Sequence, residues 1–189
     1  MKKFRKGFTL LELLVVIGVM GLMSSMAMIA GQQATDAARA NNIADGLEKA
    51  ASAMMMYYGD NSDIIAVEGI GDSTTIKIAD LVSGASAYLK RTGSDEDEDM
   101  LIASTATNKD GKYYVDVQGT APAQEWWIVY TIPATDIAGV GPILKNKANR
   151  MGLKTTSTSN AAYDGETATV AMKVRGKLAA AAGGGGDNP

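Results

Sequence analysis

The apolar residues of this chain are concentrated in one segment near its N-terminus. From Phe8 to Ala30 the only conventional polar residues are Thr9, Glu12, Ser24 and Ser25. A helix rises about 1.5 Å per residue, so this segment measures about 34 Å, and the hydrocarbon core of a membrane is about 30 Å thick. The pattern therefore predicts a helix that can cross a membrane.

A second pattern extends this helix beyond the apolar segment. Apolar residues recur along one helix face, at i, i+4, i+7, i+8, i+11 and i+15. They are Ile43, Leu47, Ala50, Ala51, Met54 and Tyr58. No proline interrupts residues 8–58, and Gly59-Asp60-Asn61-Ser62 supplies a stop signal. We predict one continuous helix over 8–58, about 75 Å long, whose second half packs against a head.

Strand patterns follow in the second half of the chain. Residues 112–118 (KYYVDVQ) and 125–132 (EWWIVYTI) are rich in β-prone side chains, and the Gly-Thr-Ala-Pro between them favours an antiparallel pair. Residues 167–175 alternate as a half-buried strand does. In a strand Trp126 and Trp127 face opposite sides, and core packing is the default for both.

Two shorter helices are expected. Residues 75–90 carry an apolar stripe, and residues 142–150 form a helix for which Pro142 suits the first position. Residues 136–141 could add an earlier turn to this helix, although Gly139 and Gly141 argue against it. Residues 59–111 otherwise form a variable connecting region, and residues 179–189 form a Gly-rich tail without an apolar face.

Composition limits the chemistry. The chain has 189 residues, no cysteine and no histidine, which excludes disulfides, the usual zinc sites, thiol nucleophiles and imidazole bases. Without the four cations of residues 2–6 it has 14 Lys and Arg against 21 Asp and Glu, a net charge of −7, which argues against a broadly basic nucleic-acid surface. We expect one domain, no enzymatic activity and no cofactor or metal. The acidic run 95–99 lacks the spacing of an EF-hand and is expected to be a solvated loop.

Two ordinary interpretations of the N-terminus fit incompletely. A cleaved secretory signal has an apolar core of about 7–15 residues followed by a small-residue site, whereas this core is longer and the small residue precedes it. A simple membrane anchor fits the length and the flanking cations. It leaves Glu12 unexplained, because an isolated carboxylate in lipid is costly.

The stretch Lys6-Gly7-Phe8-Thr9-Leu10-Leu11-Glu12 resembles the class III signal of type IV pilins and related pseudopilins. The resemblance implies that a prepilin peptidase cuts after Gly7 on the cytoplasmic side and methylates the new amine of Phe8. The leader's cations hold it in the cytoplasm. The resemblance also implies an assembly segment formed by Phe8, Thr9 and Glu12, in which Glu12 pairs with the N-terminal amine of a neighbouring subunit.

The implied fold is α+β: the long N-terminal helix packs on an antiparallel sheet. The expected divisions are a leader at 1–7, a membrane and polymerisation helix at 8–31, an amphipathic half at 32–58, a head at 59–178 and the tail. The subunit would wait in the inner membrane and then polymerise through its N-terminal helices into an extracellular filament. Its expected partners are the peptidase, an assembly platform and ATPases, and the filament would serve adhesion, motility, aggregation, DNA uptake or conjugation.

Several alternatives stay open. Residues 126–150 are loosely similar to type IVb pilins, although the seven-residue leader is short for that branch, and without cysteines something other than a disulfide must pin the C-terminal loop. The chain could instead be a pseudopilin of a type II secretion system, or an anchored binding domain that never polymerises. Gly18 and Gly21 each weaken a helix by about 1 kcal/mol, which suggests either close helix packing or local melting.

Overall fold

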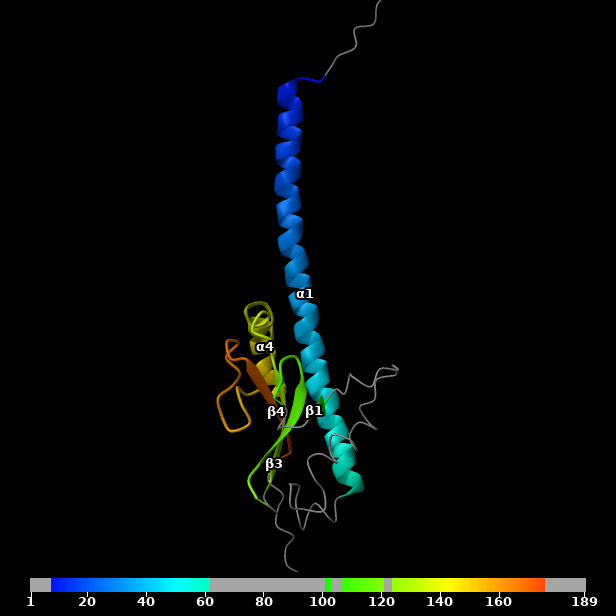
Figure 1. Ribbon diagram of the computed structural model, residues 1–189, viewed down its shortest axis with the longest axis vertical. Coiled ribbons are helices and arrows are strands. Elements are labelled where there is room, and N and C mark those ends of the chain that lie inside the picture. The colour runs from blue at the N-terminus through cyan, green and yellow to red at the C-terminus, as the bar shows by residue number, and fades with distance from the viewer. Residues whose placement is uncertain (1–7, 62–100, 103–106, 121–123, 176–189) are drawn as a thin grey trace, which may run out of the picture.

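The computed structural model describes residues 8–61, 101–102, 107–120 and 124–175. The elements in chain order are α1 (Leu10–Asp60), β1 (Leu101–Ile102), β2 (Tyr113–Gln118), β3 (Glu125–Thr131), α4 (Ile137–Met151) and β4 (Thr169–Arg175). Figure 1 shows α1 as a long rod, with α4 and the sheet beside only its C-terminal half.

Helix α1 is continuous over 51 residues, as predicted, and lies two residues further along the chain than expected. It ends within the predicted stop signal. The backbone N–H of Asn61 donates to the carbonyl of Tyr58 at 3.2 Å, and the Asn61 side chain donates to the carbonyl of Tyr57 at 3.0 Å. These bonds satisfy carbonyls that the end of a helix leaves unpaired.

The two halves of α1 have different surroundings. Every residue from Phe8 to Thr35 is exposed, and we call residues 8–35 the stalk. Partial burial begins at Asp36, and the described residues from Asp36 onward form the head. The apolar stripe predicted along this half is confirmed: Ile43, Leu47, Ala50, Ala51 and Met54 are buried, and Tyr58 packs edge-on against Trp126 with ring centroids 5.3 Å apart.

The head contains a four-stranded sheet in the order β1-β2-β3-β4. Strands β2, β3 and β4 are antiparallel, as predicted, in a register that pairs Val115 with Ile128 and Ile128 with Met172. Strand β1 was not predicted, and it pairs parallel to β2. The face toward α1 is apolar. Its buried residues are Val115, Trp126, Ile128, Tyr130, Val170, Met172 and Val174.

A glycine lets the sheet approach α1 closely. The Tyr113 hydroxyl of β2 lies 3.3 Å from the carbonyl oxygens of Asn42 and Ile43 and donates to them. A Cβ atom at Gly46 would lie only 2.1 Å from that hydroxyl oxygen. Gly46 therefore provides the space that the Tyr113 side chain occupies.

Helix α4 begins at Ile137, five residues before Pro142, so the predicted start was wrong. Both doubtful glycines lie inside the helix because packing requires them. A Cβ at Gly139 would lie 2.3 Å from a carboxylate oxygen of Asp36, and one at Gly141 would lie 2.1 Å from the carbonyl oxygen of Gly165. These contacts outweigh the low helix propensity of glycine.

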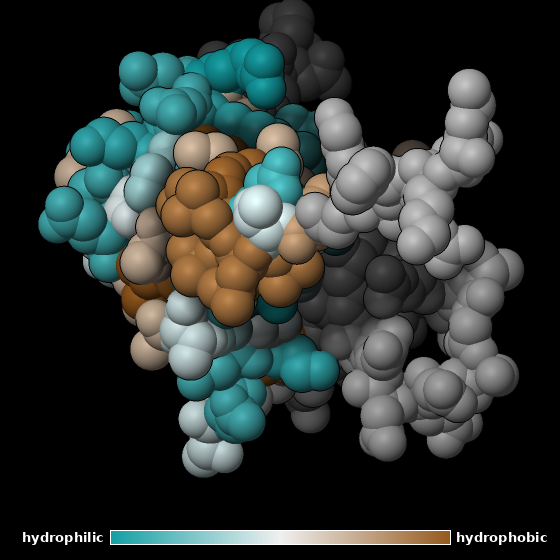
Figure 2. Space-filling view, turned by 90° about the horizontal axis from the view of Figure 1, so that it is seen from above, coloured by the Kyte–Doolittle hydropathy of each residue, from teal (hydrophilic) through white to brown (hydrophobic). Residues whose placement is uncertain are grey.

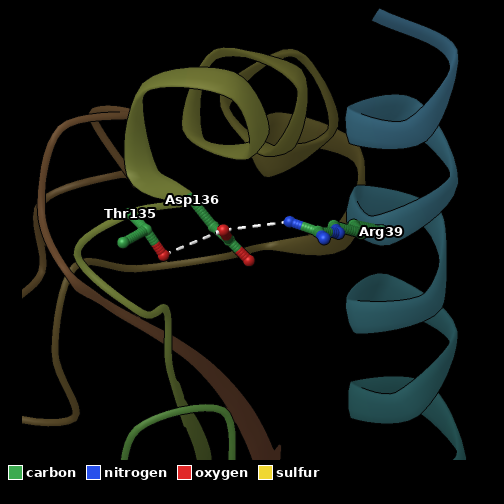
Figure 3. A network of polar contacts seen from close by, with 3 residues as sticks. All are labelled: Arg39, Thr135 and Asp136. Atoms are coloured by element: carbon green, nitrogen blue, oxygen red, sulfur yellow. Dashed lines mark hydrogen bonds and ion pairs between the residues drawn. The ribbon is translucent and has the colours of Figure 1, made fainter. Parts of the chain in front are cut away.

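Polar contacts join the start of α4 to α1 (Figure 3). The Arg39 guanidinium pairs with the Asp136 carboxylate at 2.9 Å, and the Thr135 hydroxyl donates to the same carboxylate oxygen at 3.1 Å. Asp136 occupies the N-cap position of α4 without capping the helix through its side chain. Its carboxylate instead joins the two helices.

The sheet face turned away from α1 is also apolar. Trp127, Val129 and Ala171 form a second buried cluster, against which Tyr114 packs. The predicted opposite orientation of Trp126 and Trp127 is confirmed, and both are buried. The Lys173 ammonium lies 5.6 Å from the centre of the Trp127 ring and pairs with Glu125 at 2.9 Å.

The loop between α4 and β4, residues 152–168, is held without a disulfide. Lys154 exchanges two backbone hydrogen bonds with Ala171, at 2.8 and 2.9 Å. The Ser157 hydroxyl donates to the Asp116 carboxylate of β2. Tyr163 is buried, and its hydroxyl donates to the carbonyl of Thr167 at 3.0 Å. A backbone bridge, a polar contact and a buried ring thus pin the C-terminal loop.

Several predictions fall outside the described residues. These are the leader 1–7, the helix over 75–90, the acidic run 95–99 and the tail 179–189.

Candidate processing and assembly site

The first turn of α1 contains a complete capping box. Thr9 is the N-cap, with φ −78° and ψ 150°. Its hydroxyl oxygen accepts a hydrogen bond from the Glu12 backbone N–H at 3.2 Å. In return, one carboxylate oxygen of Glu12 accepts from the Thr9 backbone N–H at 2.9 Å and from the Thr9 hydroxyl at 3.0 Å. Two backbone donors at the helix start are therefore satisfied.

This geometry gives Thr9 a definite position beside Glu12. The carboxylate is folded back to the start of α1, where the helix dipole favours negative charge. The T-x-x-E spacing is itself a sequence signal for a capping box, and it identifies this pairing without a structure. Phe8 precedes the cap and is 87% exposed. The structure thus brings Phe8, Thr9 and Glu12 to one helix end, while Gly7 lies outside the described residues.

The other polar side chains of the stalk's apolar segment are bonded within α1. The Ser24 hydroxyl donates to the carbonyl of Met20 at 2.9 Å, and the Ser25 hydroxyl donates to the carbonyl of Gly21 at 3.0 Å. Together with Thr9 and Glu12, all four conventional polar residues of the segment have a partner in the same helix. This arrangement suits a hydrocarbon environment, where unsatisfied polar groups are costly.

The stalk exposes a long apolar surface. Seen from the N-terminal end, its side chains project as a brown cluster beside the more hydrophilic head (Figure 2). Its large apolar side chains are 47% to 87% exposed. A surface of this kind marks contact with lipid or protein. Within the described residues, α1 is the one helix that could cross a membrane by length and composition.

Gly18 and Gly21 lie on the open stalk. A Cβ atom added at either position would meet nothing within 4 Å, and α1 runs through both without a break. Close packing at these glycines therefore requires a second molecule. Packing and local melting both stay predictions.

The described residues contain no cluster of three or more acidic side chains arranged to hold a metal ion. The N-terminal end of α1 is an exposed apolar helix with one carboxylate, Glu12, in its first turn. That arrangement can anchor a protein in a membrane and can pair with a cation brought by another molecule.

Comparisons with known proteins bear on the same segment. Residues 2–28 match the family described as "Prokaryotic N-terminal methylation motif". The chain is also similar to a "Fimbrial protein" of Neisseria meningitidis serogroup A, with 31% identity over 80 residues, which cover 41% of this chain and 47% of that protein. The match therefore spans about half the length of the curated relative. No solved structure gives a significant match.

Proposed function

We propose that the chain is a structural subunit of the type IV pilin kind that polymerises into an extracellular filament, because residues 2–28 match the N-terminal methylation motif and a long N-terminal helix packs on the antiparallel strands β2, β3 and β4. The exposed apolar stalk supports this proposal most directly, because residues 8–35 make no buried contact with the head. In the precursor, lipid would cover this surface. In the filament, the stalks of other subunits would cover it.

Glu12 provides the register of assembly in this proposal. Cleavage after Gly7 creates a new amine at Phe8, one residue before the N–H group that Glu12 already binds. A neighbouring subunit's amine would replace the hydroxyl of Thr9 as the partner of the carboxylate. Pairing a buried charge favours one arrangement of the stalks over others, because an unpaired carboxylate in the same surroundings is costly.

The proposed sequence of events needs several other proteins. A prepilin peptidase removes residues 1–7 and methylates Phe8 at the inner membrane, and an assembly platform with cytoplasmic ATPases extracts the subunit. The filament then lies on the cell surface, where it serves adhesion, motility, aggregation, DNA uptake or conjugation. The fimbrial name of the Neisseria relative supports this location.

The experiment that tests the proposal is intact-mass and N-terminal peptide analysis of protein sheared from the cell surface. We expect fibres whose subunit begins at Phe8 and carries one added methyl group. A chain that retains residues 1–7 and stays in the membrane would instead be an anchored domain. A processed chain confined to the cell envelope would be a pseudopilin.

Glu12→Ala gives a second test. We expect normal cleavage and methylation but no sheared fibres, because the variant lacks the carboxylate that pairs with the neighbouring amine. Glu166→Gln, a change of an exposed head carboxylate, is the matched control and should leave fibres unchanged. Normal fibre yield from Glu12→Ala would refute the assembly role.

A further inference from the structure

Helix α4 presents a cationic outward face. Its 15 residues include Lys145, Lys147 and Arg150 and no Asp or Glu. Lys147 is bonded to the Asn41 side chain of α1. Lys145 and Arg150 are exposed, and neither has an ion-pair partner among the described residues. These two cations, five residues and so about 140° apart around the helix, flank the exposed side of α4 and are available to another molecule.

The outward face of α1 in the head is complementary. Directly opposite the buried stripe, exposed residues follow one another along the helix surface. We call them the α1 strip: Asp45, Glu48, Lys49, Ser52, Met55 and Met56. Asp45 and Glu48 have no ion-pair partner within the described part of the chain, and with Lys49 they leave the strip negatively charged.

The strip also contains two large apolar residues that are exposed. Met55 is 56% exposed and Met56 58%, and no other large apolar side chain of the described head is comparably exposed. Methionine adapts its shape to an incoming surface. On α4, Pro142 and Ala138 lie on the outward face, one and two turns before Lys145 respectively, and are exposed as well. Each face therefore combines charge with a small apolar area.

We propose that the outward face of α4 in one subunit docks on the α1 strip of a second copy, with Lys145 and Arg150 opposite Asp45 and Glu48. This inference rests on the proposed function, since it describes a contact between heads in the filament. The two faces differ, so the contact is head-to-tail and repeats into an open helical array. Charge complementarity aligns the two heads, while Glu12 sets the register of the apolar stalks, which supply most of the buried surface.

A second copy fits this face better than a nucleic acid. The processed chain has a net charge of −7, which opposes association with a polyanion. Every neighbouring subunit, in contrast, carries an acidic strip at high local concentration.

Cysteine cross-linking tests the contact without interference, because the chain has no cysteine. We expect the double variant Glu48→Cys, Lys145→Cys to give a ladder of disulfide-linked oligomers when sheared fibres are oxidised. Each single variant should give monomers, and co-assembled single variants should give dimers but no ladder. This pattern is specific to a head-to-tail interface.

The matched control pairs Glu48→Cys with Thr158→Cys, an exposed residue of the loop between α4 and β4. We expect it to remain monomeric. Absence of the ladder in fibres that assemble normally would overturn the inference and leave the proposed function intact. Absence of wild-type fibres would instead contradict the proposed function.

Charge exchange provides an independent readout. Lys145→Glu with Arg150→Glu should lower the yield of sheared fibres about fivefold, more in dilute salt, because like charges then face each other. Adding Asp45→Lys and Glu48→Lys should restore the yield. Circular dichroism of the detergent-extracted subunit checks that the head remains folded. An unchanged yield, or a loss that the second pair does not restore, would contradict the proposed contact.

Discussion

Gly46 lies where the Tyr113 side chain packs against α1. This contact determines what a substitution of the glycine does to stability. A Cβ atom there would lie 2.1 Å from the Tyr113 hydroxyl oxygen and 2.4 Å from the ring carbon that bears it. In contrast, a Cβ atom at Gly31 of the same helix would meet nothing within 4 Å. Two glycines of α1 thus have opposite responses to the same substitution.

We predict that Gly46→Ala destabilises the subunit by about 1–3 kcal/mol, because the ring must move to make room. Gly31→Ala should stabilise α1 slightly, since alanine has the higher helix propensity. Thermal unfolding of the detergent-solubilised subunit, followed by circular dichroism, measures both. Equal stability of the two variants would contradict the close approach at Gly46.

At the scale of elements, one exposed carboxylate also helps to hold the loop between α4 and β4. Asp164 accepts backbone hydrogen bonds from Glu166 and Thr167 at 2.9 Å each, and a third from the Thr167 hydroxyl at 2.7 Å. These bonds to the ionised form lower the pKa of Asp164 to about 2. Beside it, burial raises the pKa of Tyr163 to about 12.

A folded-state pKa below that of the unfolded chain makes the contribution of Asp164 dependent on pH. The contribution is complete above about pH 4, near the unfolded pKa, and is lost as the pH falls to about 2. We predict that Asp164→Asn lowers the melting temperature at pH 7 and that the difference from wild type disappears near pH 2. A constant difference across this range would show that the carboxylate charge is not responsible.

The sequence predicted those helices and strands whose formation depends on their own residues and not on contacts with distant parts of the chain. The apolar stripe of α1 and the alternation of β4 were confirmed because periodicity alone decides which face is buried. The start of α4 was missed because Gly139 and Gly141 resemble helix breakers until Asp36 and Gly165 are placed beside them. Strand β1 was missed because two residues carry no periodic signal, and its pairing depends on β2.

The polar features of the molecule also divide into those that local sequence determines and those that depend on tertiary contacts. The motif around Phe8 and Glu12 and its family resemblance could be identified from sequence, because processing signals are linear. The pairing of Arg39 with Asp136 could not, since the two residues are distant in the chain and meet only when α4 packs on α1. The outward face of α1, with Asp45, Glu48, Lys49 and Ser52, follows from the helical period alone, whereas that of α4 became visible only after the start and the buried residues of α4 were known.

At the scale of the whole molecule, the stalk and the head are separate in their contacts. Residues 8–35 are exposed throughout, and the core begins with Ala40. We predict that deleting residues 1–35 yields a monomeric head that is soluble without detergent and unfolds cooperatively. Deleting residues 1–47 removes Ala40, Ile43 and Leu47 and should prevent folding. Gel filtration and thermal unfolding distinguish these outcomes, and aggregation of the shorter deletion would contradict the separation.

The attachment of the head along one side of α1 has a mechanical consequence. In a filament held together through its stalks, the α1 helices carry the tension. The sheet lies to one side of α1 and does not carry it. Pulling then stretches helical hydrogen bonds, which can lengthen and reform, and it spares the β2, β3 and β4 ladders. Residues of the head that lie outside the proposed contact between α4 and the α1 strip can therefore change without altering how the filament carries tension.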